Sequence, residues 1–241
     1  MLVAGCLAPP SFGSLGHMDA MWPVIGVIGG RGGAGASTFA AVLAATAGLG
    51  GRAILIDLDP VAGGLDVLLG VESVPGARWS GLRLDGGRLD ATALLDGLPA
   101  WGRVAVLSAD VDPGPAAVAQ VLDVAARAGP VVVDLSRWST PWRVAALDRC
   151  ALVVLVCGAD VRSVTGARSV RLGLGAAVTG LVVVRAARTA AAPPRVAQLV
   201  DMPLIGAVPA MSRGADSPLA VTALPRAMSR VACGVLDAVQ S

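Results

Sequence analysis

The 241-residue sequence contains no lysine, tyrosine or asparagine, and it has one glutamate and one histidine. Every basic side chain is therefore an arginine, and the 19 basic and 17 acidic residues give a formal net charge of +2. This near-neutral charge does not favour nonspecific nucleic-acid binding, which needs an excess of positive charge. The single histidine, His17, and four widely separated cysteines without a C-x-x-C pair exclude a zinc site of the usual ligand pattern.

Charged residues are also scarce, at 15% of the sequence, whereas apolar residues make up 55%. This composition excludes extensive disorder and predicts a large buried core. No apolar stretch in the body of the chain reaches the roughly 18 residues that a transmembrane helix requires. We therefore expect a globular protein without a membrane span. Residues 1–21 are expected to be a disordered leader without a function, and residues 22–241 to form a single domain.

From Trp22 onward, short runs of Val, Ile and Leu alternate with Ala-rich segments of helical length. This order predicts parallel strands joined by crossover helices. The strands are expected at Val24 to Gly29, Ala53 to Asp57, Val104 to Leu107, Val131 to Leu135, Leu152 to Val156, Leu181 to Val184 and Leu204 to Ala207. The helices are expected at Ser37 to Leu49, Ala116 to Ala128, Trp142 to Leu147, Val161 to Leu172 and Leu219 to Val239. Because the strands are apolar throughout, we expect a doubly wound α/β fold with a mostly parallel sheet and helices on both faces.

Two segments interrupt this alternation. Residues from Val74 to Gly102 are less regular and are expected to form an excursion between the second and third core strands. The stretch Ala190 to Pro194, rich in proline and alanine, is expected to be a loop.

A glycine-rich segment, Gly30 to Thr38, follows the first expected strand and precedes an Ala-rich helix. Glycines allow a tight turn whose N–H groups point inward, and the helix N-terminus adds a partial positive charge. Such a loop binds phosphate. Its sequence satisfies two patterns, because Gly30, Gly32 and Gly35 form G-x-G-x-x-G while Gly30, Gly35 and Ser37 form most of a P-loop pattern.

The two patterns lead to different functions. Asp57 lies 22 residues after Gly35, near the distance at which a dinucleotide-binding fold places its ribose-binding carboxylate. A P-loop protein instead needs a hydroxyl for Mg²⁺, which Ser37 offers, and carboxylates at nearby strand ends, which Asp59 and Asp134 offer. The several strand-end carboxylates favour the P-loop interpretation. A dinucleotide-dependent oxidoreductase remains the alternative.

The motifs together resemble those of the deviant Walker A ATPases of the MinD/ParA group. Their loop reads approximately K-G-G-x-G-K-S/T, a second strand ends in D-x-D-P-x-x-G-x-L-D, and a later strand ends in an Asp that begins switch II. The corresponding segments here are Arg31 to Thr38, Asp57 to Asp66 and Val133 to Arg137. The segment Leu147 to Arg162 is similar to the actinobacterial CpaE-like branch, which includes the septum site-determining protein Ssd. Those relatives usually carry an N-terminal receiver-like domain, and we do not expect residues 1–21 to form one.

The resemblance implies a role for each matching residue. ATP would be bound by Gly30, Arg31, Gly32, Gly33, Ala34, Gly35, Ala36, Ser37, Thr38 and Asp59. Mg²⁺ would be held by Ser37, with Asp134 as an outer-sphere carboxylate, and Asp57 would position the attacking water. The implied protein is a cytoplasmic nucleotide-binding regulator of septum placement or of secretion or pilus localisation. It would form a nucleotide-dependent homodimer and bind a cell-division or secretion-system protein, with no nucleic acid and at most peripheral contact with the inner face of the membrane.

Two departures from the family pattern weaken the expected chemistry. Ala36 replaces the lysine that contacts the β- and γ-phosphates, and Arg31 replaces the signature lysine that acts across the dimer interface, with a planar fork in place of an ammonium group. Loss of a charge-assisted hydrogen bond costs about 1.5–3 kcal/mol, so binding is expected to be weakened. Because phosphoryl transfer requires neutralised charge on the γ-phosphate, we expect very slow or absent ATP hydrolysis. A pseudo-ATPase scaffold with no nucleotide function is therefore a further alternative.

Three further features of the sequence bear on what the protein binds, namely a late strand end, a group of arginines and the last helix. The family reads adenine with an asparagine after a late strand, where this chain has Val184 and Arg185, so the base preference is open. The arginines Arg162, Arg168 and Arg171 are expected to lie on a solvated helix face rather than in a DNA site. The last helix carries an apolar face that we expect to pack on the sheet rather than on a membrane.

Overall fold

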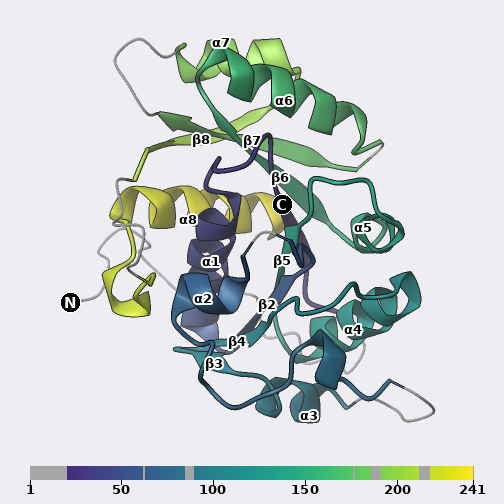
Figure 1. Ribbon diagram of the computed structural model, residues 1–241. Helices are drawn as coiled ribbons and strands as arrows, with labels where there is room; N and C mark the ends of the chain where they lie inside the picture. Colours follow the sequence, from purple (N-terminus) through teal and green to yellow (C-terminus); the bar gives the residue numbers. More distant parts are fainter. Residues whose placement is uncertain are drawn as a thin grey trace.

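The computed structural model describes residues 21–61, 63–84, 90–175, 177–185, 191–211 and 218–240. The expected leader, apart from Met21, lies outside the described residues. The described strands form one sheet in the order β3-β4-β2-β5-β1-β6-β7-β8 (Figure 1). The strands are β1 (Val24–Gly29), β2 (Ala53–Asp57), β3 (Ala100–Trp101), β4 (Val104–Leu107), β5 (Val131–Leu135), β6 (Leu152–Gly158), β7 (Thr179–Arg185) and β8 (Leu204–Pro209). All neighbouring strands are parallel except β3 and β4.

Helices cover both faces of this sheet. The helices are α1 (Ala36–Ala47), α2 (Leu65–Leu69), α3 (Ala91–Asp96), α4 (Pro115–Ala128), α5 (Pro141–Leu147), α6 (Val161–Leu172), α7 (Pro193–Val200) and α8 (Arg226–Gln240), with 3-10 turns η1 (Gly48–Gly50), η2 (Trp79–Gly81) and η3 (Val221–Ala223). One face packs against α1, α2 and α8, and the other against α3 to α7 (Figure 1). The expected doubly wound, mostly parallel α/β fold is confirmed.

The core follows from the alternation of side chains along each strand. In β1, Ile25 and Val27 belong to the core beneath α1 and α8, whereas Val24 and Ile28 belong to the core on the opposite face. All four side chains are buried. A strand that is apolar on both faces has a continuous hydrophobic run in its sequence. For this reason the bounds of β1, β2, β4 and β5 agree with those expected from the sequence.

The strand order decides between the two interpretations of the glycine-rich loop. β5 lies between β1 and β2 and pairs with both. A dinucleotide-binding fold, with strand order 3-2-1-4-5-6, instead places its first and second strands side by side. The dinucleotide alternative is therefore wrong, because the sheet does not have that order.

The last helix begins later than expected. The sequence interpretation started it at Leu219, but α8 begins at Arg226, directly after Pro225. The Leu219 N–H donates to the Leu68 carbonyl at 2.8 Å, and the Leu219 carbonyl accepts from the Trp101 indole at 3.0 Å. These two bonds tie Leu219 to α2 and β3. Its backbone N–H and carbonyl are therefore bonded to other elements and are not part of a helix. The helix that follows packs on α1 and β8, as expected.

The expected loop from Ala190 to Pro194 is wrong at its end, because α7 begins at Pro193. Proline is suited to the first turn of a helix, where its missing N–H would have no partner. The excursion from Val74 to Gly102 contains η2, α3 and the edge strand β3. Within the described residues, no helix combines the length and apolar character needed to cross a membrane.

Candidate phosphate-binding site

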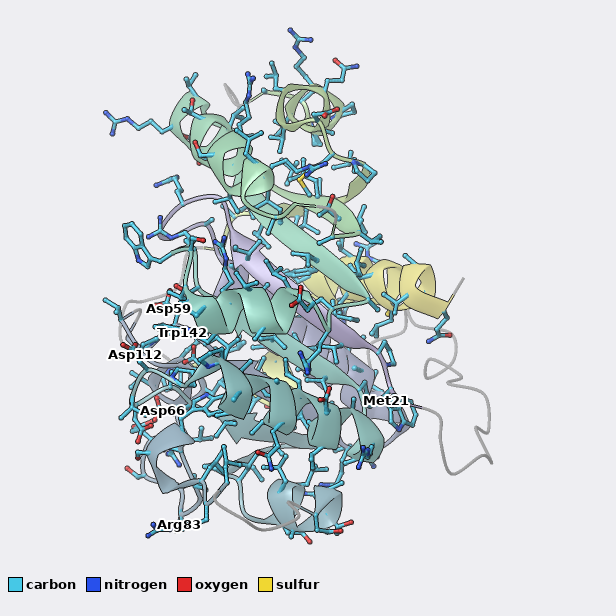
Figure 2. All side chains as sticks on the ribbon, turned by 90° about the vertical axis from the view of Figure 1, so that its right-hand side faces the viewer. Met21, Asp59, Asp66, Arg83, Asp112 and Trp142 are labelled. Atoms are coloured by element: carbon cyan, nitrogen blue, oxygen red, sulfur yellow. The ribbon has the colours of Figure 1, made fainter. Side chains whose placement is uncertain are left out.

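A cavity of about 570 Å³ opens at the carboxyl ends of β1, β2 and β5. Parallel strands commonly bring functional residues together at this edge. Of the residues expected to form a site, those that line the cavity are Arg31, Gly32, Gly33, Ala34, Gly35, Ala36, Ser37, Thr38, Asp57, Asp59 and Asp134. Figure 2 shows this edge from the side, with Asp59 and Trp142 on it and Met21, which precedes β1, on the opposite side.

The loop between β1 and α1 has the backbone of an anion cradle. Gly33 and Gly35 have φ angles of 72° and 87°, which glycine adopts without strain. The first backbone bond of the α1 helix runs from the Phe39 N–H to the Gly35 carbonyl at 2.9 Å. Among the described residues, no acceptor bonds the amides of Ala36 to Thr38, and no side chain caps the helix. These amides are available to an anion, and a Cβ placed on Gly33 or Gly35 would meet no atom within 4 Å.

Gly30 has a different role from the one expected. It does not line the cavity. A Cβ on Gly30 would lie 2.9 Å from the Cβ of Ala167 and 3.0 Å from its Cα, while a Cβ on Gly166 would collide with the Gly30 carbonyl oxygen. Gly30 therefore allows the loop to pack directly on α6, and its contribution to the site is to position the loop.

Two buried carboxylates lie beside the loop. Asp57 and Asp134 are paired in register on β2 and β5, with 2% and 5% of their surface exposed. Burial, and then the charge of Asp57, raise the pKa of Asp134 to about 8, although the Ser37 hydroxyl opposes this by donating a hydrogen bond. Burial also raises the pKa of Asp57 to about 6. A cation at this position would relieve the repulsion between the two groups.

Ser37 and Asp134 line the same cavity, as a Mg²⁺ site would require, and the Ser37 hydroxyl is among the groups that act on the pKa of Asp134. Within the described residues, however, no group of three or more His, Cys, Asp or Glu side chains could hold a metal ion. Mg²⁺ commonly binds through one or two protein oxygens and completes its coordination with water and substrate phosphates. The Ser37 hydroxyl and the Asp134 carboxylate fit that arrangement.

Asp57 organises the segment that follows β2. Its carboxylate accepts hydrogen bonds from the amides of Asp59 at 2.9 Å and Leu65 at 3.1 Å, and from the amide of Ala109. Asp59 is half-buried, and its own carboxylate accepts from the Val61 amide at 3.3 Å. The carboxylate of Asp57 therefore serves at least to fix the turn that places Asp59 at the cavity.

Two tryptophans from the same core bond the segment that begins with Asp57. The indole of Trp79 donates to the Asp57 carbonyl at 2.8 Å, and the indole of Trp142 donates to the Leu58 carbonyl at 3.3 Å. Trp79 belongs to η2 and Trp142 to α5. Asp57 is the last residue of β2 and Leu58 follows it, so both bonds satisfy carbonyls where the strand ends and hold that end of β2 at the cavity.

Arg31 extends along the loop toward α6. Its Nε donates to the Ser163 hydroxyl at 2.7 Å, and its Nη2 lies 3.7 Å from the carboxylate of Asp160, the N-cap residue of α6. Ala36, on the cavity wall, offers no side-chain charge. In place of the two family lysines, the chain therefore has Arg31, whose side chain is bonded to α6, and Ala36, which has only a methyl group.

The far wall of the cavity is apolar. It includes Leu68, Val184, Met211 and Met228. Val184 lies near the end of β7, where the sequence interpretation noted the missing asparagine. A planar base could pack against this wall without a side-chain amide to select it.

The sequence interpretation did not assign Arg137 to the site, but Arg137 lines the cavity. Its Nη2 lies 3.7 Å from the position that a Cβ on Gly32 would occupy. The signal in the sequence was a cation three residues after the strand-end Asp134, in a chain without lysine. Of the three arginines expected on a solvated face, Arg162 and Arg168 are exposed on α6. The expectation is wrong for Arg171, which is half-buried, with its Nε atom buried.

The described structure is similar to several solved structures. A ParA family ATPase from Chlorobium tepidum has a TM-score of 0.71 at 15% identity, covering 92% of this chain and 98% of that one. The cell division ATPase MinD of Pyrococcus furiosus has a TM-score of 0.65 at 19% identity, covering 90% and 100%. The chain has the MinD/ParA fold. A third match is the septum site-determining protein MinD of Pyrococcus horikoshii complexed with Mg-ADP, with a TM-score of 0.63 at 18% identity, covering 92% and 99%.

The sequence is also similar to an uncharacterized protein of Mycobacterium tuberculosis strain H37Rv. The two are 43% identical over 201 residues, which cover 80% of this chain and 56% of the relative. The chain therefore spans little more than half the length of this curated relative. No family model matches the sequence.

Proposed function

We propose that the protein is a MinD/ParA-type regulator that binds a nucleoside triphosphate with Mg²⁺ and hydrolyses it very slowly or not at all. The single observation that carries the proposal is that Ser37 and Asp134 line one cavity with a loop whose amides from Ala36 to Thr38 have no acceptor among the described residues. The MinD/ParA fold supports it, because a solved neighbour is a Mg-ADP complex and another is bound to AMPPNP.

The loop amides would hold the phosphates, and the partial positive charge of the α1 N-terminus would add to the attraction. Ser37 and water would complete the coordination of Mg²⁺, with Asp134 as an outer-sphere carboxylate, and the ion neutralises phosphate charge when bound. Asp59 faces the same cavity. The apolar wall would take the base. Because none of the described lining residues carries a side-chain amide that could read its edge, we expect weak discrimination between ATP and GTP.

Slow hydrolysis follows from the charges around the loop. Transfer of a phosphoryl group requires cations at the γ-phosphate, and Ala36 supplies none. Asp57, expected to position the attacking water, already accepts three amide bonds. The protein would then act through the conformation that the nucleotide favours rather than through product formation.

The regulatory setting is proposed from the resemblance to the CpaE-like and Ssd branch. It comprises septum placement, or localisation of a secretion or pilus apparatus, through a nucleotide-dependent homodimer and a protein partner. One solved neighbour is the MinC:MinD cell division protein complex of Aquifex aeolicus, which supports a partner of this general kind. Contact with a membrane would be peripheral at most.

Calorimetric titration tests the proposal. Mg-ATP, Mg-ADP and Mg-GTP are each added to the purified chain, with Ser37→Ala and Asp134→Asn as site variants and Asp112→Asn, an exposed carboxylate change, as the control. Binding of Mg-ATP that both site variants weaken supports the proposal. No binding of any of the three nucleotides favours the pseudo-ATPase scaffold, for which Ala36 is the specific observation.

A further inference from the structure

We propose that Arg137 supplies to bound phosphate the positive charge that Ala36 no longer provides. The inference rests on the proposed function and adds to it a residue that the family motif does not contain. Only two cationic side chains line the cavity in the described part of the chain, namely Arg31 and Arg137. The question is therefore which of them is placed to meet a phosphate on the loop.

Arg31 is already engaged by α6. Its guanidinium bonds the Ser163 hydroxyl and faces the Asp160 carboxylate, which itself accepts hydrogen bonds from the Ser163 amide and hydroxyl. Hydrogen bonding to Ser163 lowers the pKa of Asp160, with a contribution from the charge of Arg31. Two of its three guanidinium nitrogens, Nε and Nη2, thus face groups of α6. Its charge is therefore partly neutralised beside the loop rather than over it.

Arg137 has no such engagement. Within the described structure its side chain makes no ion pair, and its guanidinium lies 5.7 Å from the ring centre of Trp138. The same guanidinium lies over Gly32, since its Nη2 is within 3.7 Å of a Cβ built on that glycine. It is thus a cation above the backbone of the loop, without a carboxylate to compete for it.

The backbone of Arg137 is held by a hydrogen bond from a buried arginine. Arg143 is 3% exposed, and its Nη1 donates to the Arg137 carbonyl at 2.9 Å while its Nη2 donates to the Gly173 carbonyl at 3.3 Å. Arg143 thereby ties the segment after β5 to the end of α6. Arg143 is a positioning residue, because it holds Arg137 in place without lining the cavity.

A guanidinium suits this role for a chemical reason. Its planar fork can donate two parallel hydrogen bonds to phosphate oxygens and remains charged at any physiological pH. A lysine at position 36 would approach from α1, whereas Arg137 approaches from the strand-end segment that carries Asp134 three residues earlier. Charge would thus reach the same phosphates from a different element of the cavity lining.

The test compares affinities for two ligands that share only the phosphate chain, Mg-ATP and Mg-tripolyphosphate. Calorimetry is carried out on wild type, Arg137→Ala, Arg137→Lys and Arg127→Ala. Arg127 is the control because it is exposed in the last turn of α4, at the opposite edge of the sheet. We expect Arg137→Ala to weaken both ligands by roughly ten- to a hundredfold, Arg137→Lys to weaken them less, and Arg127→Ala to leave both unchanged.

A second comparison uses Ala36→Lys as a background. If the two cations serve the same phosphates, Arg137→Ala should cost less affinity in Ala36→Lys than in wild type. Tryptophan fluorescence gives an independent readout, because withdrawal of the guanidinium from Trp138 on binding should change its emission, and Trp138→Phe should abolish that change.

The outcomes separate this inference from the proposed function. If wild type binds neither Mg-ATP nor Mg-tripolyphosphate, both the proposed function and the role of Arg137 are wrong. If wild type and Arg137→Ala bind Mg-ATP equally tightly, the role of Arg137 is wrong and the proposed function is still supported. A loss confined to Mg-ATP also overturns the inference, because Arg137 would then contact the base or ribose. Unfolding temperatures of all variants verify that the exposed side chain at position 137 is not needed for folding.

Discussion

Asp57 on β2 and Asp134 on β5 occupy directly paired positions of adjacent parallel strands, and both carboxylates are buried. Two negative charges in this environment repel each other and lose hydration. The protein therefore keeps a carboxyl pair whose pKa values are raised to about 6 and about 8. Such an arrangement costs stability in the absence of a cation, and this cost can be measured.

Asp134→Asn should stabilise the ligand-free protein, increasingly so as the pH rises from about 4 toward 8. The folded protein retains a proton on Asp134 that the unfolded chain, with an ordinary pKa of 3.8, has released. The free energy of unfolding of wild type therefore falls with pH across this window. Asparagine removes the part of this dependence that Asp134 causes, and Asp57, whose pKa burial raises to about 6, keeps its own part. At pH 7.5 in EDTA, we expect the unfolding temperature to rise by at least about 2 °C. Asp112→Asn, at an exposed site, should shift it little at any pH. Equal pH dependence in wild type and Asp134→Asn would contradict this account.

Ala36→Lys should restore much of the affinity for Mg-ATP. The methyl group of Ala36 lines the cavity at the start of α1, where an ammonium group could reach a bound phosphate. A regained charge-assisted bond is expected to tighten binding by roughly ten- to a hundredfold. Calorimetry measures the affinity, and release of inorganic phosphate measures turnover. Wild type that already hydrolyses ATP as fast as Ala36→Lys would show that the missing lysine is not what limits the reaction.

Gly30→Ala should destabilise the protein and weaken Mg-ATP binding, although Gly30 does not line the cavity. The added methyl group would lie within about 3 Å of the Ala167 backbone, so the loop or α6 must shift. Overpacking of this kind costs about 1–3 kcal/mol. Gly51→Ala is the matched control, because Gly51 has an extended backbone with open space around it. Thermal unfolding and calorimetry on both variants provide the measurement, and similar behaviour of the two would argue against the packing role of Gly30.

The thiols of Cys150 and Cys157 should resist alkylation in the native protein. Burial raises their pKa values to about 12 and about 11. At pH 8, roughly one molecule in a thousand or fewer then carries either thiolate, which is the reactive form. Iodoacetamide labelling followed by mass spectrometry of the two peptides should show slow modification that becomes rapid in guanidinium chloride. Rapid native labelling of either peptide would mean that the buried environment does not persist in solution.

The sequence predicted the central strands and the cluster at their carboxyl ends because both depend on local patterns. Four strands were located within their bounds by continuous apolar runs, and the end of each strand placed Asp57 and Asp134 at one edge. The same patterns failed at Leu219, which is apolar but held by bonds to α2 and β3. They also failed at Pro193, where proline begins a helix instead of interrupting one.

The finer organisation of the site could not be predicted from spacing. The packing role of Gly30 depends on α6, which is distant in the sequence. The position of Arg137 depends on a buried Arg143 that reaches its carbonyl. Contacts between elements of this kind leave no periodic signal, so the motif identified the loop but not the cation above it.

The close approach of Gly30 to Gly166 and Ala167 links the geometry of the cradle to a helix that contributes nothing to the cavity wall. At these three positions, the size of the side chain limits substitution more than its polarity or charge. A mutational survey of every position should therefore find that one stretch of α6 tolerates change as poorly as the glycine-rich turn, even though no ligand atom would ever touch it.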